Sequence, residues 1–159
     1  MTRTAAPLLW FALVACASAP KSGPETFQAK LDATNEVPTP SLSGNTPSGT
    51  ATFTRQGDSL VYKVTANGLS SAPIAAHIHT GAPGVAGPVI VPLAVTPGPT
   101  EGTAVGEGTI DASAINGKNA DGSAMTMSDL LAAMRSGNTY VNVHTANNKP
   151  GESRGQIQP

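Results

Sequence analysis

The sequence predicts an all-β sandwich or barrel with one short helix, and three observations support this fold class. Short runs of alternating apolar and polar residues recur along the chain after residue 25. The 17 glycines and 14 prolines supply the turns that many short strands need. Only one segment, 126–137, has the composition of a helix instead. The length of 159 residues suits a single domain.

The N-terminal residues 1–15 are predicted to be a signal peptide rather than part of the fold. Arg3 precedes an apolar stretch that is too short for a membrane-spanning helix. The stretch ends in "LVAC", which resembles the bacterial lipobox and implies lipid modification of Cys16. Residues 16–25 would then form a lipidated cysteine and a flexible tether. An ordinary secretory signal cleaved after "ASA", residues 17–19, is the alternative.

Cys16 also limits where the protein can reside and what it can bind. It is the only cysteine, so an intramolecular disulfide is excluded. Its lipid would hold an exported protein at a bacterial membrane. If the cell has two membranes, Ser18 favours the outer one, because lipoproteins retained at the inner membrane usually carry Asp at this position. The net charge of −1 provides no basic surface for nucleic acid. From the predicted lipid anchor, the expected partners are the membrane and another envelope protein.

Strands are expected wherever apolar residues alternate between turn-forming residues. Eight segments have this pattern: 26–33, 49–55, 59–66, 73–80, 88–95, 102–110, 139–146 and 153–158. Pro92 interrupts the apolar run 88–95 and confines its second half to an edge or a bulge, because proline cannot donate to a neighbouring strand.

The segment 126–137 is expected to form a helix of two or three turns. Thr126 and Asp129 have the spacing of a capping box, in which each side chain accepts a backbone amide of the other residue. Gly137 suits the position just after the helix end. We expect this helix to cover one open end of the sandwich.

Two of the three histidines are separated by a single residue in the strand predicted at 73–80. Alternation assigns Ile74, Ala76 and Ile78 to the face that packs in the core. His77 and His79 therefore point to the opposite face.

The third histidine, His144, has the same orientation in the strand predicted at 139–146. Val141 and Val143 form the core face there, so His144 points away from it together with Tyr140 and Asn142. If the two strands are neighbours, the three imidazoles converge.

Three converging imidazoles would suit a metal ion. Residues i and i+2 of a strand are about 6.5–7 Å apart, which lets two imidazoles lean toward one ion. Neutral imidazole favours copper or zinc over calcium or magnesium. A site formed by His77, His79 and His144 would keep one open coordination position. The alternative is that the histidines are only polar surface residues.

Three further polar residues are candidates for supporting such a site. Asn142 shares the face of His144, and Glu152 and Arg154 lie at the start of the last predicted strand. Arg154 near the histidines could hold an anion or orient a ligand. An ordinary surface ion pair between Glu152 and Arg154 is the alternative.

Four motifs give the chain a resemblance to a known family. They are "NEVPTP" (35–40), "LVYKVTANGL" (60–69), "AAHIHTGAPGVAGPVIVPL" (75–93) and "YVNVHTANNKPGESRGQI" (140–157). They are similar to the CHRD domain, named after chordin and found in many bacterial exported proteins, and they assign residues 26–158 to it. The resemblance implies an immunoglobulin-like or related antiparallel β-sandwich, with His77, His79 and His144 in the histidine motifs. Animal members are extracellular and bind growth factors.

A fainter resemblance links the chain to copper/zinc superoxide dismutases, which carry an HxH pair on a strand of a Greek-key sandwich. This chain lacks their remaining metal-ligating histidines, their zinc aspartate and their disulfide, which argues against dismutase activity. Three functions remain open at this point. The first is a non-catalytic envelope lipoprotein that binds copper or zinc, the second a surface interaction module, and the third a copper-dependent redox enzyme.

Overall fold

The structure is a computed structural model that describes residues 23–159. The predicted signal peptide, Cys16 and most of the predicted tether lie outside the described residues. Within residues 23–159, no helix is long and apolar enough to cross a membrane.

In the described residues, nine antiparallel strands form one continuous sheet. Their bounds are β1 Thr26–Asp32, β2 Ser48–Gln56, β3 Ser59–Asn67, β4 Pro73–Thr80, β5 Val89–Leu93, β6 Thr96–Pro97, β7 Ala104–Ile110, β8 Thr139–Thr145 and β9 Ser153–Gln156. Their order in the sheet is β5-β4-β8-β9-β1-β2-β3-β7-β6. Two short 3₁₀ turns, η1 (Ala33–Asn35) and η2 (Ala112–Ala114), follow β1 and β7.

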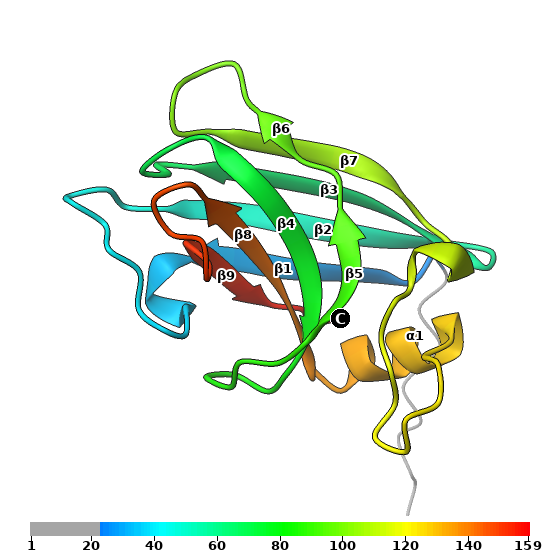
Figure 1. Cartoon of the computed structure of the whole chain (residues 1–159). Helices are drawn as coiled ribbons and strands as arrows, with labels where there is room; N and C mark the ends of the chain where they lie inside the picture. The colour runs from blue at the N-terminus through cyan, green and yellow to red at the C-terminus, as the bar shows by residue number, and fades with distance from the viewer. Residues whose placement is uncertain (1–22) are drawn as a thin grey trace, which may run out of the picture.

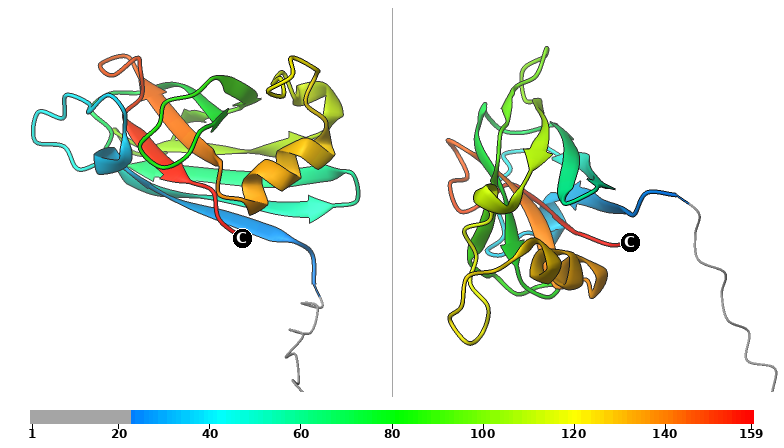
Figure 2. Two further views of the ribbon diagram at one scale, coloured as in Figure 1. Left: turned by 90° about the horizontal axis from the view of Figure 1, so that it is seen from below. Right: turned by 90° about the vertical axis from the view of Figure 1, so that its right-hand side faces the viewer.

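The sheet curls so that its two halves pack face to face. Figure 1 shows β4, β5 and β8 crossing in front of β1, β2, β3 and β7, and Figure 2 shows the same two layers from below. Apolar side chains of both halves meet between them, among them Ile78 and Val141 from one layer and Phe53 and Val64 from the other. For residues 23–159, the all-β fold with one short helix is therefore confirmed.

Helix α1 (Met127–Arg135) lies at one end of the two layers (Figure 1). The predicted capping box is present: the Thr126 side chain accepts the Asp129 amide, and the Asp129 carboxylate accepts the Thr126 amide. Gly137 follows the helix with a φ of 68°, a backbone conformation that favours glycine. Leu130 and Met134 bury one face of the helix in the core.

The outermost strands of the sheet, β5 and β6, each contain a proline. Pro92 lies in β5, as expected for a residue confined to an edge strand. β6 has only two residues, Thr96 and Pro97, and the sequence did not predict it, because a proline-containing pair has no alternation to detect.

One residue assigned to the core is found outside it. Ile74 is 55% exposed, whereas Ala76 and Ile78 of the same strand are fully buried. The pairing of β4 with β8 shifts register between Pro73 and Ala75. This irregularity breaks strict alternation at the start of the strand, so the prediction for Ile74 is wrong.

Candidate metal centre

Two adjacent strands bring the three histidines together. β4 pairs with β8 in antiparallel register, with His77 opposite Asn142 and Ala75 opposite His144. His144 therefore lies diagonally across from His77, and the small side chain of Ala75 leaves room for its imidazole. His79 is two residues along β4 on the same face. The predicted orientation is confirmed, and the pairing of β4 with β8 meets the condition under which the three imidazoles converge.

The imidazoles are close enough to share one ion. His77 Nδ1 lies 3.0 Å from His144 Nε2. One ring nitrogen from each of His77, His79 and His144 lies within 4.8 Å of the others. Ligands at about 2.0–2.1 Å from a tetrahedral ion are about 3.3 Å apart, so small side-chain rotations would complete the site.

Backbone carbonyls fix how two of the rings present their nitrogens. His79 Nδ1 lies 2.9 Å from the Gly87 carbonyl, and His144 Nδ1 lies 2.9 Å from the Lys149 carbonyl. A carbonyl only accepts, so each Nδ1 carries the proton and each Nε2 is an acceptor. His144 Nε2 accepts a hydrogen bond from His77 Nδ1, whereas, within residues 23–159, the lone pair of His79 Nε2 is free. Metal-ligating histidines characteristically donate their second nitrogen in this way. The Nε2 of His79 is buried and has no hydrogen-bond partner among the described residues.

The face that carries the histidines is covered, although it points away from the apolar core. His79 and His144 are only 8% and 7% exposed, while His77 is half-buried. The segment 81–88 folds over this face, where the amide of Gly87 donates to Tyr140 Oη. Gly87 packs so tightly that a Cβ there would lie 1.8 Å from the Thr80 carbonyl oxygen. Access to the cluster is therefore from the side of His77.

All three imidazoles are held in the neutral form near pH 7. Burial, together with the neighbouring His144 and His79, lowers the pKa of His77 to about 4. Burial also lowers the pKa of His79 and that of His144. Neutral imidazole is the form that binds metal, so the cluster needs no deprotonation at neutral pH.

Arg154 lies one aromatic ring away from the histidines. The Tyr140 ring stacks on His79 at 4.8 Å between centroids, and the Arg154 guanidinium lies 3.4 Å from the Tyr140 centroid. Because β8 lies between β4 and β9, Tyr140 separates the two groups. Arg154 thus lies near the cluster but does not contact it directly.

Glu152 and Asn142 occupy separate positions around the site. Glu152 is fully buried and accepts hydrogen bonds from Ser70, Thr145 and Asn148, and none of these partners is a histidine. The alternative of a surface ion pair between Glu152 and Arg154 is wrong, because both are buried and the ion pairs found in residues 23–159 involve Glu25.

Asn142 lies opposite His77 and donates to the buried carboxylate of Glu36 at 3.3 Å. No pattern in the sequence indicated that Glu36 makes this contact. It also could not reveal the carbonyls of Gly87 and Lys149, because backbone acceptors leave no residue-type signal. Alternation did assign Tyr140 to the same strand face as His144. That assignment was the one sign in the sequence that Tyr140 would lie near the histidines and could stack on His79.

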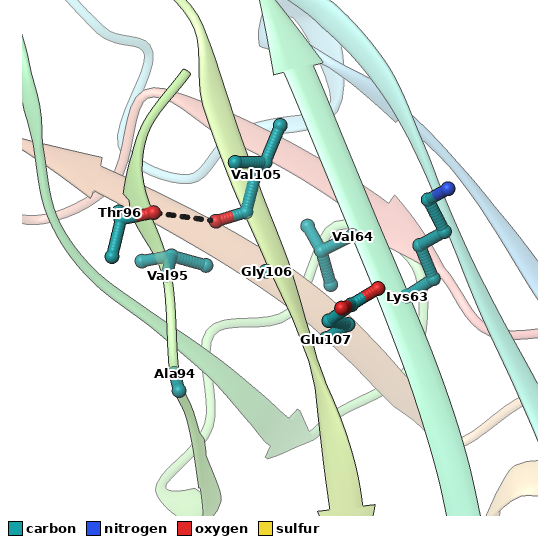
Figure 3. A pocket seen from close by; sticks show the side chains of 8 residues that line it. All are labelled: Lys63, Val64, Ala94, Val95, Thr96, Val105, Gly106 and Glu107. Carbon is teal, nitrogen blue, oxygen red and sulfur yellow. Dashed lines mark hydrogen bonds between the residues drawn. The ribbon is translucent and has the colours of Figure 1, made fainter. Parts of the chain in front are cut away.

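A groove in the other layer of the sandwich lacks the nitrogen ligands of the histidine cluster (Figure 3). It has a volume of about 450 Å³ and lies between β7, β3 and the chain from Ala94 to Thr96. Its charged side chains are Lys63 and Glu107, on directly paired strand positions. With no histidine in its wall, this groove is a less suitable metal site than the histidine cluster.

The fold and the site define an antiparallel β-sandwich with a covered histidine cluster on its outer face. The family model of the CHRD domain matches residues 27–157, so the chain belongs to the CHRD domain family. The expectation from the sequence motifs is thereby confirmed. Comparisons with curated proteins and with solved structures found no match.

Proposed function

We propose that the protein is a non-catalytic, exported lipoprotein of the bacterial cell envelope that binds one copper or zinc ion through His77, His79 and His144. The free Nε2 of His79 carries this proposal. A buried acceptor without a partner is unfavourable, and a cation at that point would satisfy it. The hydrogen bond from Nδ1 to the Gly87 carbonyl keeps that lone pair available.

The choice of copper or zinc follows from the chemistry of the ligands. The cluster offers three neutral nitrogen donors and no carboxylate, a set that suits copper and zinc better than magnesium or calcium. Three protein ligands would leave one coordination position for water or another small ligand. His77 is the most accessible of the three and places this position toward solvent.

Metal titration of the purified protein tests the proposal. We expect about one zinc or copper ion per chain, and a loss of affinity greater than about 100-fold in His79→Ala, because the variant removes a ligand. Glu107→Gln is the matched control, since it removes an exposed metal-capable group in the groove of Figure 3. Equal binding by the wild type and His79→Ala would refute the metal site and leave the interaction module as the surviving function.

Membrane attachment through Cys16 is tested separately in cells. We expect the wild-type protein in the membrane fraction, and Cys16→Ser in the soluble fraction, because dual acylation is needed for stable anchoring. A Cys16→Ser variant that stays with the membrane would contradict the lipid anchor without affecting the metal proposal.

A further inference from the structure

Glu152 is a fully buried carboxylate that has no ion-pair partner in the described part of the chain. Four donors surround its two oxygens instead. Its Oε1 accepts the backbone amide of Ser70. Its Oε2 accepts the Ser70 hydroxyl at 2.7 Å, the Asn148 side-chain amide at 3.0 Å and the Thr145 hydroxyl. A buried charge is tolerated only where other groups compensate it, and here hydrogen bonds do so.

These contacts require an ionised carboxylate at position 152. Burial raises the pKa of Glu152, but hydrogen bonds from Thr145, Asn148 and Ser70 outweigh burial and lower this pKa overall. Each carboxylate oxygen faces an N–H group that can only donate. The side-chain NH₂ of a glutamine would therefore meet another donor in either orientation. Glu152→Gln thus disturbs the hydrogen bonds of this side chain with little change in its volume.

Glu152 holds both ends of the turn that follows His144. Thr145 comes directly after His144, and Asn148 directly precedes Lys149, whose carbonyl lies 2.9 Å from His144 Nδ1. The backbone amide of Asn148 also donates to Thr145 Oγ1 at 3.1 Å. The carboxylate, the hydroxyl and the turn backbone therefore form one connected set of hydrogen bonds beside the acceptor that orients His144.

The same carboxylate joins this turn to the strand that carries the other two histidines. Ser70 lies in the connection between β3 and β4, and β4 carries His77 and His79. A second contact runs beside the first, since Asn147 Nδ2 donates to the Ser70 carbonyl at 3.0 Å. Glu152 thus ties the turn after β8 to the chain that leads into β4.

We propose that Glu152 is a positioning residue of the histidine cluster, because the turn that it holds keeps the Lys149 carbonyl at His144 Nδ1 and directs His144 Nε2 toward the ion. A fixed acceptor on the second nitrogen holds a metal-ligating imidazole in one orientation. His79 is oriented separately: its acceptor, the Gly87 carbonyl, lies between β4 and β5, and none of the donors to Glu152 comes from that connection. The effect on metal binding rests on the proposed function, whereas the effect on the His144 ring does not.

Solvent exchange of the imidazole Nδ1 protons, followed by NMR in the metal-free protein at neutral pH, tests the proposal. In Glu152→Gln we expect the His144 proton to exchange about tenfold faster than in the wild type, because its acceptor is no longer held in place. The His79 proton should keep its wild-type rate. Equal acceleration of both protons would assign Glu152 to overall stability, and unchanged exchange at His144 would show that the turn holds without it. Either result overturns the proposal.

Two further variants separate positioning from stability. Ser70→Ala removes only the hydroxyl donor to Glu152, so it tests the same contact if Glu152→Gln does not fold. We expect a smaller acceleration at His144 and none at His79, and equal changes at both would again overturn the proposal. Thr126→Ala removes the cap of helix α1 and none of the hydrogen bonds to Glu152, so it should not accelerate His144 relative to His79.

Zinc titration tests the consequence for binding. We expect Glu152→Gln to bind zinc about tenfold more weakly than the wild type. Glu107→Gln makes the same chemical change at an exposed position of the groove in Figure 3 and should bind like the wild type. Equal zinc affinity of Glu152→Gln and the wild type would overturn the positioning role. A wild type that binds no metal would refute the proposed function, and Nδ1 exchange would still decide whether Glu152 orients His144.

Discussion

His79 shows how a backbone contact can control a side chain that would bind metal. Its Nδ1 is held by the Gly87 carbonyl, while its Nε2 is buried without a partner. An unsatisfied buried acceptor costs about 1–3 kcal/mol of folding free energy. The folded protein thus holds His79 Nε2 without a hydrogen-bond partner among the described residues, and a bound metal ion would supply one.

Gly87→Ala should weaken metal binding without removing a ligand. The added Cβ would lie 1.8 Å from the Thr80 carbonyl oxygen, so the segment 81–88 must move and release His79 Nδ1. We expect a loss of metal affinity of about 10–100-fold, measured by calorimetric titration.

Gly84→Ala is the control for Gly87→Ala, because it lies in the same segment and its Cβ would meet no atom within 4 Å. Its φ of 76° makes alanine mildly strained there, so some stability is lost but affinity should hold. If both variants bind metal like the wild type, the Gly87 carbonyl does not position His79.

The orientation of the histidines was predictable from the sequence, but their burial was not. Alternation fixes the face on which His77, His79 and His144 lie, because it is a local property of each strand. Their burial depends on the segment 81–88 folding back, which no periodicity encodes. The pairing of β4 with β8, which brings His77 to His144 across 67 residues, was an assumption that only the structure confirms.

At the scale of the elements, helix α1 is the part that local sequence specified best. Both members of its capping box and the glycine after its end were identified from spacing alone.

The start of β4 is the element that the local sequence predicted least well, because the register shift beside Pro73 places Ile74 in solvent. Caps are local chemistry, whereas a register shift depends on the partner strand.

Thr126→Ala should destabilise the protein through the helix alone. The Thr126 hydroxyl accepts the Asp129 amide at 3.2 Å, and the substitution leaves this amide unpaired. We expect the free energy of unfolding in urea to fall by about 1 kcal/mol. Ser128→Ala, at an exposed position in the first turn of the helix, is the control and should not lower stability, because alanine favours the helix at least as well as serine. A Thr126→Ala variant as stable as Ser128→Ala would show that the cap contributes nothing.

At the scale of the whole molecule, the buried histidines make stability depend on pH. Their pKa values are lowered in the folded state, so the unfolded chain binds protons more readily. Stability is therefore fully present above the ordinary histidine pKa of 6.5 and is lost as the pH falls toward the lowered pKa of about 4 at His77. The raised pKa of Glu36 acts in the opposite direction, because its buried carboxyl takes up a proton more readily in the folded state than in the unfolded chain.

Urea unfolding in the presence of a chelator measures this dependence. We expect the unfolding midpoint of the metal-free protein to fall steadily between about pH 7 and about pH 5. A variant with glutamine in place of His77, His79 and His144 should show a flatter profile over this range. Parallel profiles for the two proteins would assign the acid sensitivity to other groups.

The prolines of the outermost strands also govern how copies of the protein meet. An open sheet offers rows of unpaired amides and carbonyls to any extended chain that approaches its ends. Pro92 in β5 and Pro97 in β6 each lack an amide hydrogen, and β6 is only two residues long. Both ends of the sheet are thus poor templates for strand addition, which protects the protein from polymerising edge to edge when it is crowded.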